Sequence, residues 1–497
     1  MKIEKLQSGP RTLRGPIIGF FAALLAWHGF ASPQFALGAD LRLNSKAVVK
    51  LFVTRQPWNM NQPWSKNPVG STVCSGFLIT EGILTNAHCV TDATYIQMEI
   101  PGVAEKQEVR IMDLNHQVDL ALLQPVIDGL LDDITPIEFG DLPVLREKVV
   151  TIGYPVGGRQ VSYTEGVVSR IDMMNYAHSK LSNLMVQTDA AINSGNSGGP
   201  VFSDESGICL GVATQVGSGN SLGYFIPVPV VKHFLKDLED GVVNGIPKVG
   251  VFVQTLENPA NRAFLGMKEG QSGVRVKKIA PYSTARKILQ VDDVLLSIDG
   301  HEIFNDGRVP FRENGKIGLN YYITTKQIGE SLDFRILRKN KERNVTIKLA
   351  AKEVMVIPRM PKFDVQPPYY EIGGIVFRVV ERRNVGKNSP ASIKAYWEMT
   401  RGEDDLEELV VIGAIYEDEV NKGYIKSVKN LRIKEINGKP ISELDDVRRA
   451  FENSARGRYH TIVLVDGQKI ILDRKQVEAR EAEIRRRYNI APYGKSG

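Results

Sequence analysis

Short apolar runs separated by turn residues fill the chain from Ala47 onward. The runs are rich in Val, Ile, Leu and aromatic residues, and clusters of Gly, Pro, Asn, Asp and Ser lie between them. Regular spacing of this kind predicts an all-β sandwich or barrel. The runs are residues 73–79, 81–90, 93–100, 118–126, 148–156, 165–171, 184–192, 200–216 and 222–228.

A helix is predicted to close this region. Pro229 lies at its start and Gly241 follows its end, which is the usual asymmetry of helix termini. We therefore expect a β-rich domain with one closing helix over residues 45–241. The apolar positions at helical spacing are Val230, Phe234, Leu235 and Leu238.

Two related units follow, over residues 246–350 and after residue 370. Each contains a hairpin phrase, LLSIDGHEI and IKEINGKPI, in which Asp-Gly or Asn-Gly joins two short strands. Helices are expected at 283–290 and 442–452. The proline-rich stretch 355–370 between the units predicts an extended, semi-rigid linker. The charged stretch at the C-terminus, about the last twenty residues, predicts a surface helix followed by an irregular tail.

The N-terminus has the order of an export signal. Four basic residues precede the apolar run 16–31, and the small residues 37–39 follow it. The run is shorter than the roughly 20 residues that a membrane-spanning helix needs, so export is favoured over an anchor. We expect the mature chain to begin near Asp40, and no other segment to span a bilayer.

Charge and cysteine content narrow the function classes. The chain of 497 residues has a formal net charge of +6. The export signal carries half of that charge, so the remainder is nearly neutral and does not indicate nucleic-acid binding. Three cysteines are too few for a disulfide scaffold, although an exported protein could oxidise one pair.

Ser197 lies in the phrase INSGNSGGPV, with glycines on both sides. Gly, Asn and Ser are ordinary turn residues, so one interpretation is a plain loop. The other is a nucleophile, because residues without side chains let backbone N–H groups approach a substrate carbonyl oxygen and stabilise its negative charge. The N–H groups of Gly195 and Ser197 are the candidates for that role.

A serine nucleophile needs a base, and the base needs a group that orients it. His88 is the candidate base, because LTNAHCV places it where a strand-like run ends. Asp119 lies among apolar residues in VDLALL, where an acid is costly unless it has a polar partner; a cap or turn role is the alternative. We expect His116 to be a solvated loop histidine. His233 belongs to the helix, and the remaining histidines lie in loops or later domains.

The phrase G-N-S-G-G also fits the G-x-S-x-G elbow of α/β-hydrolases. That motif requires a helix after the serine, with the acid and the histidine following in the sequence. Here Pro200 leads into a strand-like run, and His88 and Asp119 both precede Ser197. The elbow interpretation is therefore rejected.

The order His88, Asp119, Ser197 on a β-rich domain resembles the chymotrypsin-fold serine proteases. TNAHCV, VDLALL and QTDAAINSGNSGGPV resemble the Deg/HtrA family, and the two later units resemble its PDZ domains. Residues 256–265 and the linker resemble the Deg branch of plant organelles. The resemblance implies a mostly β protein, with a chymotrypsin-like double β-barrel protease domain and two PDZ-like α+β domains.

The resemblance also implies domain limits. We expect a protease domain over 40–244 and a first PDZ domain over 245–352. In that domain Asp292-Asp293 replaces the usual Gly-Asp before a strand, which could alter the turn. The other segments are a signal peptide over 1–39, a linker over 353–368, a second PDZ-like domain over 369–480 and a tail over 481–497.

As function, the resemblance implies an ATP-independent endoprotease that degrades unfolded or damaged polypeptides in protein quality control and the stress response. It implies trimers and, with the export signal, the periplasm. The alternatives are a chaperone or PDZ scaffold with a resting protease domain, and a non-proteolytic esterase. No cofactor, metal or nucleic-acid partner is expected.

The resemblance assigns roles to single residues. His88 is general base and acid, Asp119 orients it, and Ser197 attacks. Cys74 and Cys89 match the disulfide beside the histidine of trypsin-like proteases; a loop of this length is worth about 3 kcal/mol, and Cys209 stays free. Zinc binding by Cys74, His88 and Cys89 is disfavoured because a fourth ligand is missing. The other assigned sites are the oxyanion hole at Gly195, Asn196 and Ser197, the specificity pocket at Ile192 and Leu222, and a loop at Val249, Gly250 and Val251 that holds C-terminal peptides.

Overall fold

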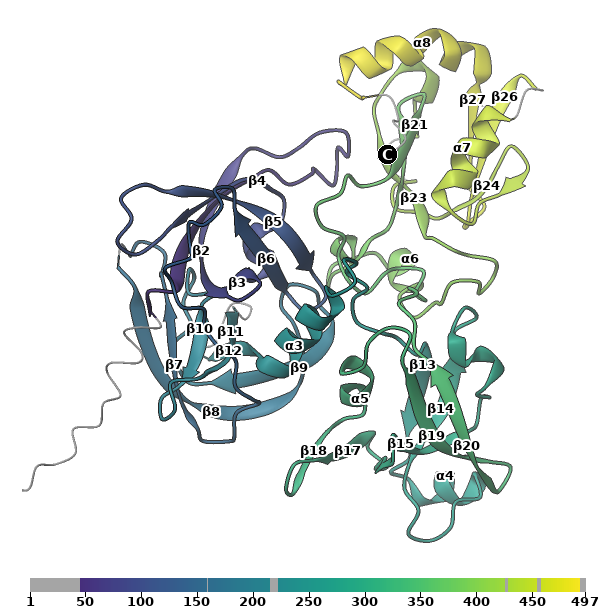
Figure 1. Ribbon diagram of the computed structural model, residues 1–497. Helices are drawn as coiled ribbons and strands as arrows, with labels where there is room; N and C mark the ends of the chain where they lie inside the picture. Colours follow the sequence, from purple (N-terminus) through teal and green to yellow (C-terminus); the bar gives the residue numbers. More distant parts are fainter. Residues whose placement is uncertain (1–44, 159, 215–221, 425–427, 454–456, 492–497) are drawn as a thin grey trace, which may run out of the picture.

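The computed structural model describes residues 45–158, 160–214, 222–424, 428–453 and 457–491. The expected signal peptide lies outside the described residues. The protein is mostly β, as predicted, and begins with two closed six-stranded barrels that lie side by side (Figure 1). The first barrel has the strand order β1-β2-β3-β6-β5-β4, and the second has β10-β11-β12-β9-β8-β7. Their strands are β1 (Val48–Arg55), β2 (Gly70–Ile79), β3 (Gly82–Thr85), β4 (Ala93–Glu99), β5 (Gln107–Asn115), β6 (Leu120–Pro125), β7 (Lys148–Gly153), β8 (Ser162–Asn175), β9 (Ser182–Thr188), β10 (Pro200–Ser203), β11 (Cys209–Thr214) and β12 (Gly223–Pro227).

Apolar side chains fill each barrel and the space between the two. Leu51 and Met98 are fully buried in the first barrel, and Val186 and Phe225 in the second. Phe77 of the first barrel belongs to a larger cluster that includes residues of the second, so the barrels share a core. The predicted closing helix is α3 (Val228–Asp237), and its Phe234 is buried in that shared core.

The main sheet of the first PDZ-like unit is antiparallel, with the path β13-β14-β15-β19-β20 to which β16 is added, and β17 and β18 form a separate two-stranded sheet. The Asp-Gly hairpin forms as predicted, since Asp299 and Gly300 both have positive φ between β15 and β16. The expected helix at 283–290 is wrong, because only one 3₁₀ turn, Thr284–Lys287, forms there. Asp292 adopts φ 74°, so it takes the left-handed conformation that a glycine would otherwise supply. The elements are β13 (Val251–Thr255), α4 (Pro259–Phe264), β14 (Val274–Ile279), β15 (Val294–Ile298), β16 (His301–Glu302), β17 (Arg308–Phe311), β18 (Gly315–Gly318), α5 (Asn320–Thr324), β19 (Ser331–Arg338) and β20 (Lys341–Lys348).

The second PDZ-like unit divides its strands between two sheets, β21-β22-β23 and β25-β24-β26-β27. A backbone bridge between Val411 and Arg432 connects the two sheets. The predicted Asn-Gly hairpin joins β24 to β25. The elements are β21 (Tyr369–Ile372), β22 (Ile375–Val379), α6 (Ala391–Lys394), β23 (Val410–Ile415), β24 (Ile433–Ile436), β25 (Lys439–Pro440), α7 (Leu444–Glu452), β26 (Tyr459–Leu464), β27 (Lys469–Asp473) and α8 (Arg474–Arg487).

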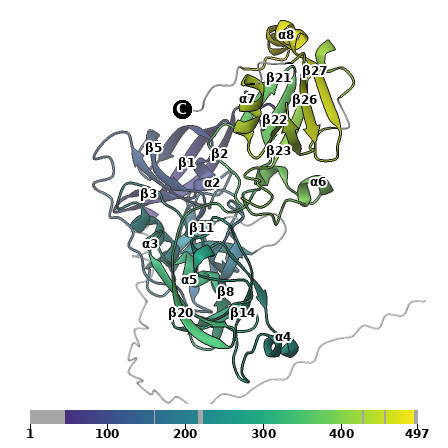
Figure 2. The ribbon, with the colours of Figure 1, turned by 90° about the vertical axis from the view of Figure 1, so that its right-hand side faces the viewer.

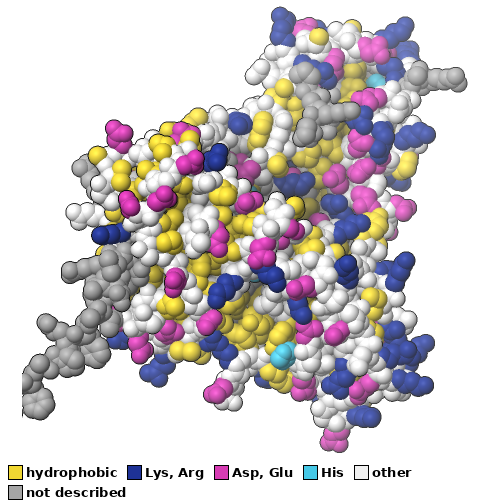
Figure 3. Space-filling view, in the orientation of Figure 1, with side chains coloured by type: hydrophobic (Ala, Val, Ile, Leu, Met, Phe, Trp, Pro, Cys, Tyr) yellow, Lys and Arg dark blue, Asp and Glu magenta, His cyan; other side chains and the backbone are white. Residues whose placement is uncertain are grey.

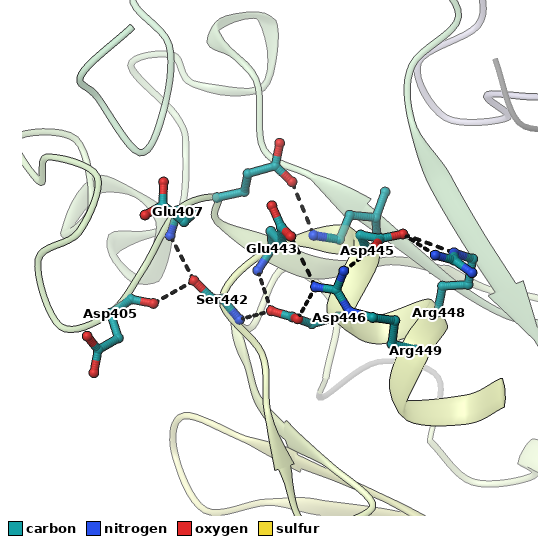
Figure 4. Close-up of polar contacts among 10 residues, drawn as sticks. Asp405, Glu407, Ser442, Glu443, Asp445, Asp446, Arg448 and Arg449 are labelled. Carbon is teal, nitrogen blue, oxygen red and sulfur yellow. Dashed lines mark hydrogen bonds and ion pairs between the residues drawn. The ribbon is translucent and has the colours of Figure 1, made fainter. Parts of the chain in front are cut away.

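Helix α7 is held at its start by a polar network (Figure 4). The Asp446 carboxylate accepts hydrogen bonds from the N–H groups of Ser442 and Glu443, which satisfies donors that a helix N-terminus leaves unpaired. Ser442 Oγ donates to the carbonyl of Asp405, 2.5 Å away. The network therefore fixes α7 to the loop that precedes β23.

Two predicted boundaries need correction. Val356 and Ile357, in the expected linker, are fully buried in a cluster with Val380 and Leu409, so this stretch is part of the second unit's core. The expected limit at residue 480 falls inside α8, whose Ile484 is buried against the same unit. The prolines and charges of these segments predicted exposure, but periodic apolar side chains within them are covered by other elements.

Both PDZ-like units lie on the same side of the barrel pair (Figures 1 and 2). The second unit reaches the first barrel through Trp64, whose ring lies 5.4 Å from Tyr369 and 5.6 Å from Tyr416. On the face in Figure 3, basic and acidic side chains are interspersed over both units. None of the helices in the described part of the chain combines the length and apolar character that crossing a bilayer requires.

Candidate active site

Both barrels contribute to the candidate site, which lies between them. His88 is on the short helix α2 (Ala87–Val90), directly after β3, and Asp119 immediately precedes β6. Ser197 lies in the turn between β9 and β10 of the second barrel. The ends of rigid strands thus hold all three side chains, which restricts their movement.

His88 and Asp119 are joined by two kinds of hydrogen bond. His88 Nδ1 lies 2.8 Å from Asp119 Oδ2, and the His88 backbone N–H donates to Asp119 Oδ1 at 2.8 Å. With Nδ1 carrying the proton, Nε2 is left as the basic nitrogen. The carboxylate therefore fixes both the position and the tautomer of the imidazole.

His88 and Asp119 each shift the pKa of the other. Burial by itself lowers the pKa of His88, but the charge and the hydrogen bond of Asp119 outweigh it and the net pKa lies above 6.5. Burial raises the pKa of Asp119, but the charge and hydrogen bonds of His88 outweigh burial and the net pKa lies below 3.8. The geometry thus favours an ionised aspartate beside an imidazole that readily accepts a proton.

Two further residues, which the sequence did not single out, hold Asp119 in place. Thr214 Oγ1 donates to Asp119 Oδ2 at 3.0 Å, and Asn86 Nδ2 donates to the Asp119 carbonyl at 3.0 Å. Asp119 is only 2% exposed; the Thr214 bond gives its buried carboxylate a further polar partner, and the Asn86 bond holds its backbone. The apolar neighbours in VDLALL indicated the burial but not the identity of the partners.

Ser197 is buried beside the histidine. Its side chain is 2% exposed, and Ser197 Oγ has no hydrogen-bond partner within the described residues. Cys89 Sγ lies 3.8 Å both from His88 Nε2 and from the Ser197 carbonyl oxygen, so one sulfur atom contacts both residues. A serine hydroxyl free of other bonds is available to an adjacent base.

The backbone before Ser197 sets the direction of the Gly195 N–H. The Ser194 carbonyl accepts from the Val156 N–H at 2.8 Å. Because a trans peptide points its C=O and N–H in opposite directions, the N–H of Gly195 faces the other way. Neither Gly195 nor Ser197 donates its N–H in the backbone hydrogen bonds of the described residues. These two groups are thus free to bind a carbonyl oxygen.

Asn196 departs from the predicted oxyanion hole. Its N–H donates to the Asn193 carbonyl at 3.0 Å and is committed to the turn. Its side-chain amide is buried and has no hydrogen-bond partner in the described part of the protein. The structure therefore gives Asn196 no free N–H for an oxyanion, and the role of Gly195 and Ser197 as donors stays a prediction.

The protein's own backbone requires glycine at two positions of this turn. Gly195 has φ +101°, and a Cβ there would lie 2.4 Å from the Tyr154 carbonyl oxygen. Gly198 has φ +85°, and a Cβ there would lie 2.1 Å from the Ser75 carbonyl oxygen. Ser75, another residue that the sequence did not indicate, also donates from Oγ to the Gly195 carbonyl at 2.8 Å.

The two expected specificity-pocket residues lie in different surroundings. Ile192 is half-buried and packs against the core of the second barrel, close to Gly223. Leu222 is 36% exposed at the start of β12. Residues 215–221, which precede it, are outside the described residues, so the pocket assignment stays a prediction.

Cys74 and Cys89 form a disulfide next to His88, and Cys209 is free and buried. Atoms of Cys74, His88 and Cys89 lie close enough together to suggest a metal site. The two sulfur atoms are bonded to one another, however, and zinc requires thiolates. The residues present therefore do not fit a zinc ion.

The expectation for His116 is wrong. Its side chain is 13% exposed, and its Nδ1 lies 2.9 Å from His178 Nε2. Its Nε2 lies 2.6 Å from Asp364 Oδ2. The polar neighbours in DLNHQ predicted solvation, but His116 is covered by partners that come from distant parts of the chain. No local sequence signal identifies such a contact.

The predicted PDZ loop lines a groove of about 330 Å³ in the first PDZ-like unit. Val249, Gly250 and Val251 form one wall, and Ile323 of α5 lies on another. Residues of the protease domain, including Gln117 and Asn183, also line the groove. The loop therefore adjoins a space that a short peptide could enter.

Comparison with known proteins agrees with this architecture. A family model described as a trypsin-like peptidase domain matches residues 74–212. A second model, described as a PDZ domain, matches residues 357–493. The second range includes residues of the expected linker and all of α8, in agreement with their burial.

Several proteins are similar in sequence to most of this chain. "Protease Do-like 2, chloroplastic" of Arabidopsis thaliana is 33% identical over 455 residues, covering 89% of this chain and 74% of that protein. "Putative protease Do-like 3, mitochondrial" of the same plant is 34% identical, covering 83% of this chain and 73% of that protein. A solved structure of the HtrA-type protease AlgW, in a variant form with a decapeptide, matches with a TM-score of 0.51 and 22% identity, covering 67% of this chain and 100% of that one.

Proposed function

The chain belongs to the Deg/HtrA family of serine proteases, and we propose that it is an ATP-independent endoprotease that hydrolyses peptide bonds of unfolded or damaged polypeptides. The observation that carries the proposal is the pair of hydrogen bonds between His88 and Asp119 beside an unpaired Ser197 hydroxyl. Such a pair prepares an imidazole to take the proton of the hydroxyl.

The proposed reaction has two halves. Ser197 Oγ attacks the carbonyl carbon of the scissile bond while His88 Nε2 takes its proton, and the N–H groups of Gly195 and Ser197 stabilise the oxyanion. The tetrahedral intermediate then collapses, the C–N bond breaks, and His88 donates the proton to the leaving amine. A water molecule, activated by His88, hydrolyses the acyl-enzyme and restores Ser197.

Unfolded chains are the proposed substrates because Ser197 lies buried between the barrels. A segment must be extended to reach it, and folded proteins rarely present such segments. We propose that the groove beside Val249–Gly250–Val251 binds C-terminal peptides, with backbone amides holding the carboxylate and the peptide extending the sheet from β13. We also propose that the chain assembles into trimers and removes damaged proteins in protein quality control.

We further propose an oxidising compartment reached by export, the periplasm in a bacterium. The Cys74–Cys89 disulfide supports this placement, because such bonds persist outside reducing compartments. The two plant relatives are named as chloroplastic and mitochondrial, so organelle import is the other route to test. Locating the tagged full-length chain by cell fractionation decides between the routes.

The test of the protease proposal is degradation of reduced casein by the full-length chain, without ATP, beside the Ser197→Ala variant. We expect cleavage by the wild type and none by the variant. If neither cleaves casein while both suppress aggregation of a client, a chaperone with a resting protease domain replaces the proposal. Equal cleavage by both would mean that Ser197 is not the nucleophile.

The pH profile adds a sharper test. His88 must be neutral to accept a proton, and its pKa lies above 6.5 because Asp119 outweighs burial. Activity is therefore expected to fall as pH decreases through a value above 6.5. Asp119→Asn should move this acid limb to lower pH and reduce kcat by about 10⁴. If the acid limb of the Asp119→Asn profile lies at the same pH as that of the wild type, the titrating group is not His88.

A further inference from the structure

A cluster outside the triad joins three distant parts of the chain next to the catalytic histidine. His116 follows β5, His178 lies between β8 and β9, and Phe363 with Asp364 precedes β21. The His178 ring lies 6.1 Å from the His88 ring on one side and 4.0 Å from the Phe363 ring on the other. A side chain of the segment before β21 is thus separated from the catalytic imidazole by a single ring.

Phe363 lies in a site built for an aromatic ring. Its ring stacks on His178 at an interplanar angle of 19° and lies 4.6 Å from the His116 ring. The Arg383 guanidinium lies 5.4 Å from the centre of the same ring. Three flat, polarisable groups therefore surround one phenyl ring, which is an arrangement that favours aromatic over aliphatic side chains.

Hydrogen bonds fix the two histidines as a rigid platform. With Asp364 ionised, His116 Nε2–H donates to its carboxylate, 2.6 Å away. Nδ1 of His116 lies 2.9 Å from Nε2 of His178, so a hydrogen bond joins the two rings. Burial lowers the pKa of His178 to about 4, so its ring is neutral and can stack on an apolar face.

The residue after the phenylalanine is also recognised. Asp364 accepts hydrogen bonds from His116 and, through Oδ1, from the backbone N–H of Asp92. Both donors belong to the protease domain, whereas Asp364 belongs to the segment that leads to the second PDZ-like unit. The protease domain thus holds an aromatic side chain and the carboxylate that follows it.

We propose that His116 and His178 form a substrate subsite for an aromatic side chain, and that the chain's own Phe363–Asp364 occupies it at rest. The rings of His88, His178 and Phe363 follow one another at 6.1 Å and 4.0 Å, so the subsite lies one ring away from the catalytic imidazole. Substrates with an aromatic residue followed by an acidic residue compete with this internal occupant. The proposal rests on the proposed function, because it assigns a subsite to the same catalytic centre.

A simpler role for the cluster would be attachment of the second PDZ-like unit to the protease domain. Trp64 provides the matched control, because it joins the same two parts through ring contacts with Tyr369 and Tyr416, and neither contact involves a triad residue. Loosening the attachment by Trp64→Ala should leave the subsite occupied. Removing the occupant by Phe363→Ala should empty it.

The test measures peptide binding by fluorescence anisotropy in the full-length Ser197→Ala protein, so that no peptide is cleaved. The probes are unstructured labelled peptides with a central Phe-Asp or Ala-Asp pair, amidated at the C-terminus so that the PDZ loop has no carboxylate to bind. We expect Phe363→Ala to tighten binding of the Phe-Asp peptide about five- to tenfold. Trp64→Ala should not change it, and neither variant should change the weaker binding of the Ala-Asp peptide.

Asp364→Asn is the second variant, which keeps the test decisive if Phe363→Ala unfolds. It weakens the bond to His116 and should tighten Phe-Asp binding by a smaller factor. His178→Ala should remove the preference for Phe-Asp over Ala-Asp. In the active enzyme, Phe363→Ala should lower KM for the Phe-Asp peptide at unchanged kcat, whereas a purely structural contact would alter both.

The outcomes separate this inference from the proposed function. Equal effects of Phe363→Ala and Trp64→Ala, or tightening that is the same for both peptides, would overturn the subsite. Loss of casein cleavage in the wild type, with the expected peptide binding in Ser197→Ala, would overturn the protease proposal and leave the subsite standing.

Discussion

The two PDZ-like units repeat one strand order but differ at one edge. In the first, β13 pairs with β14 and forms the edge of the sheet; in the second, β22 holds the corresponding position beside β23. The second unit has an additional strand, β21, which pairs with the other edge of β22. The edge that faces the groove in the first unit is therefore already occupied in the second.

The helix beside this edge also differs between the two units. In the second unit, Phe451 of α7 stacks on Tyr370 of β21 with the rings 5.8 Å apart. In the first unit, α5 contributes no buried residue, and the groove remains beside it. One fold can thus leave its edge strand open beside a groove or cover that edge with a strand of its own chain, depending on which residues precede the edge.

The largest expected effect concerns the two helices. Phe451→Ala should lower the free energy of unfolding of the second unit by about 3–5 kcal/mol, because a buried ring is lost and a cavity remains. Tyr321→Ala, on α5, should cost about 1 kcal/mol or less. Hydrogen exchange of the β22 and β13 amides measures each unit separately. Similar losses in both units would show that α5 and α7 stabilise their units equally, which contradicts the difference described above.

The next effect is on peptide binding. Gly250→Ala should weaken binding of an apolar C-terminal peptide at least tenfold, roughly 1.4 kcal/mol. Gly250 has φ +68°, and a Cβ would lie 2.8 Å from Ser283 Cβ, so the loop must shift. Gly300→Ala is the control, because Gly300 also has positive φ but nothing within 4 Å. Isothermal titration on the Ser197→Ala protein measures the affinities. Retained affinity in Gly250→Ala would place peptide binding elsewhere.

The attachments of the two units can be separated. Trp64→Ala should speed hydrogen exchange in β21 severalfold and leave β13 unchanged, because Trp64 contacts the second unit alone. Arg312→Ala should speed hydrogen exchange in β17 and β18 of the first unit and leave β21 unchanged. Arg312 donates to the carbonyls of Leu142 and Pro143 in the protease domain. If each variant loosens both units, they dock as one body.

The smallest effect depends on pH and belongs to the second unit. Burial, followed by the charge of Glu371, raises the pKa of Glu481 above its usual 4.5. The folded protein then binds this proton more tightly than the unfolded chain, so stability from this group falls as pH rises above about 4.5. Glu481→Gln should therefore stabilise by about 1 kcal/mol at pH 7 and by less at pH 4.5, measured by urea unfolding.

Glu302→Gln in the first unit is the control for this last prediction. Glu302 is exposed, and exposed charges contribute little to stability. We expect this substitution to change the free energy of unfolding by no more than about 0.5 kcal/mol. A stabilisation by Glu481→Gln that is constant between pH 4.5 and pH 7 would show that a hydrogen bond, and not the titration, is responsible.

Local patterns predicted the parts of the protein that depend on neighbours in sequence. Alternating apolar runs indicated the barrels, and Asp-Gly and Asn-Gly indicated the hairpins. Prediction failed where contacts are distant: His116 and Asp364 are 248 residues apart, and polar neighbours gave no sign of their pairing. The burial of Val356 and Ile357 was missed for the same reason, because prolines nearby suggested a solvated linker.

The sequence by itself determined the chemistry that this chain can perform. It placed a histidine after one strand, an acid among apolar residues, and a serine among glycines, and these choices restrict the backbone wherever they occur. The tertiary structure alone decided which groups meet. Folding brought Thr214 to Asp119, closed the edge of β22 with β21, and placed Phe363 on His178. Each of these outcomes depends on packing between segments far apart in the chain, which no local pattern encodes.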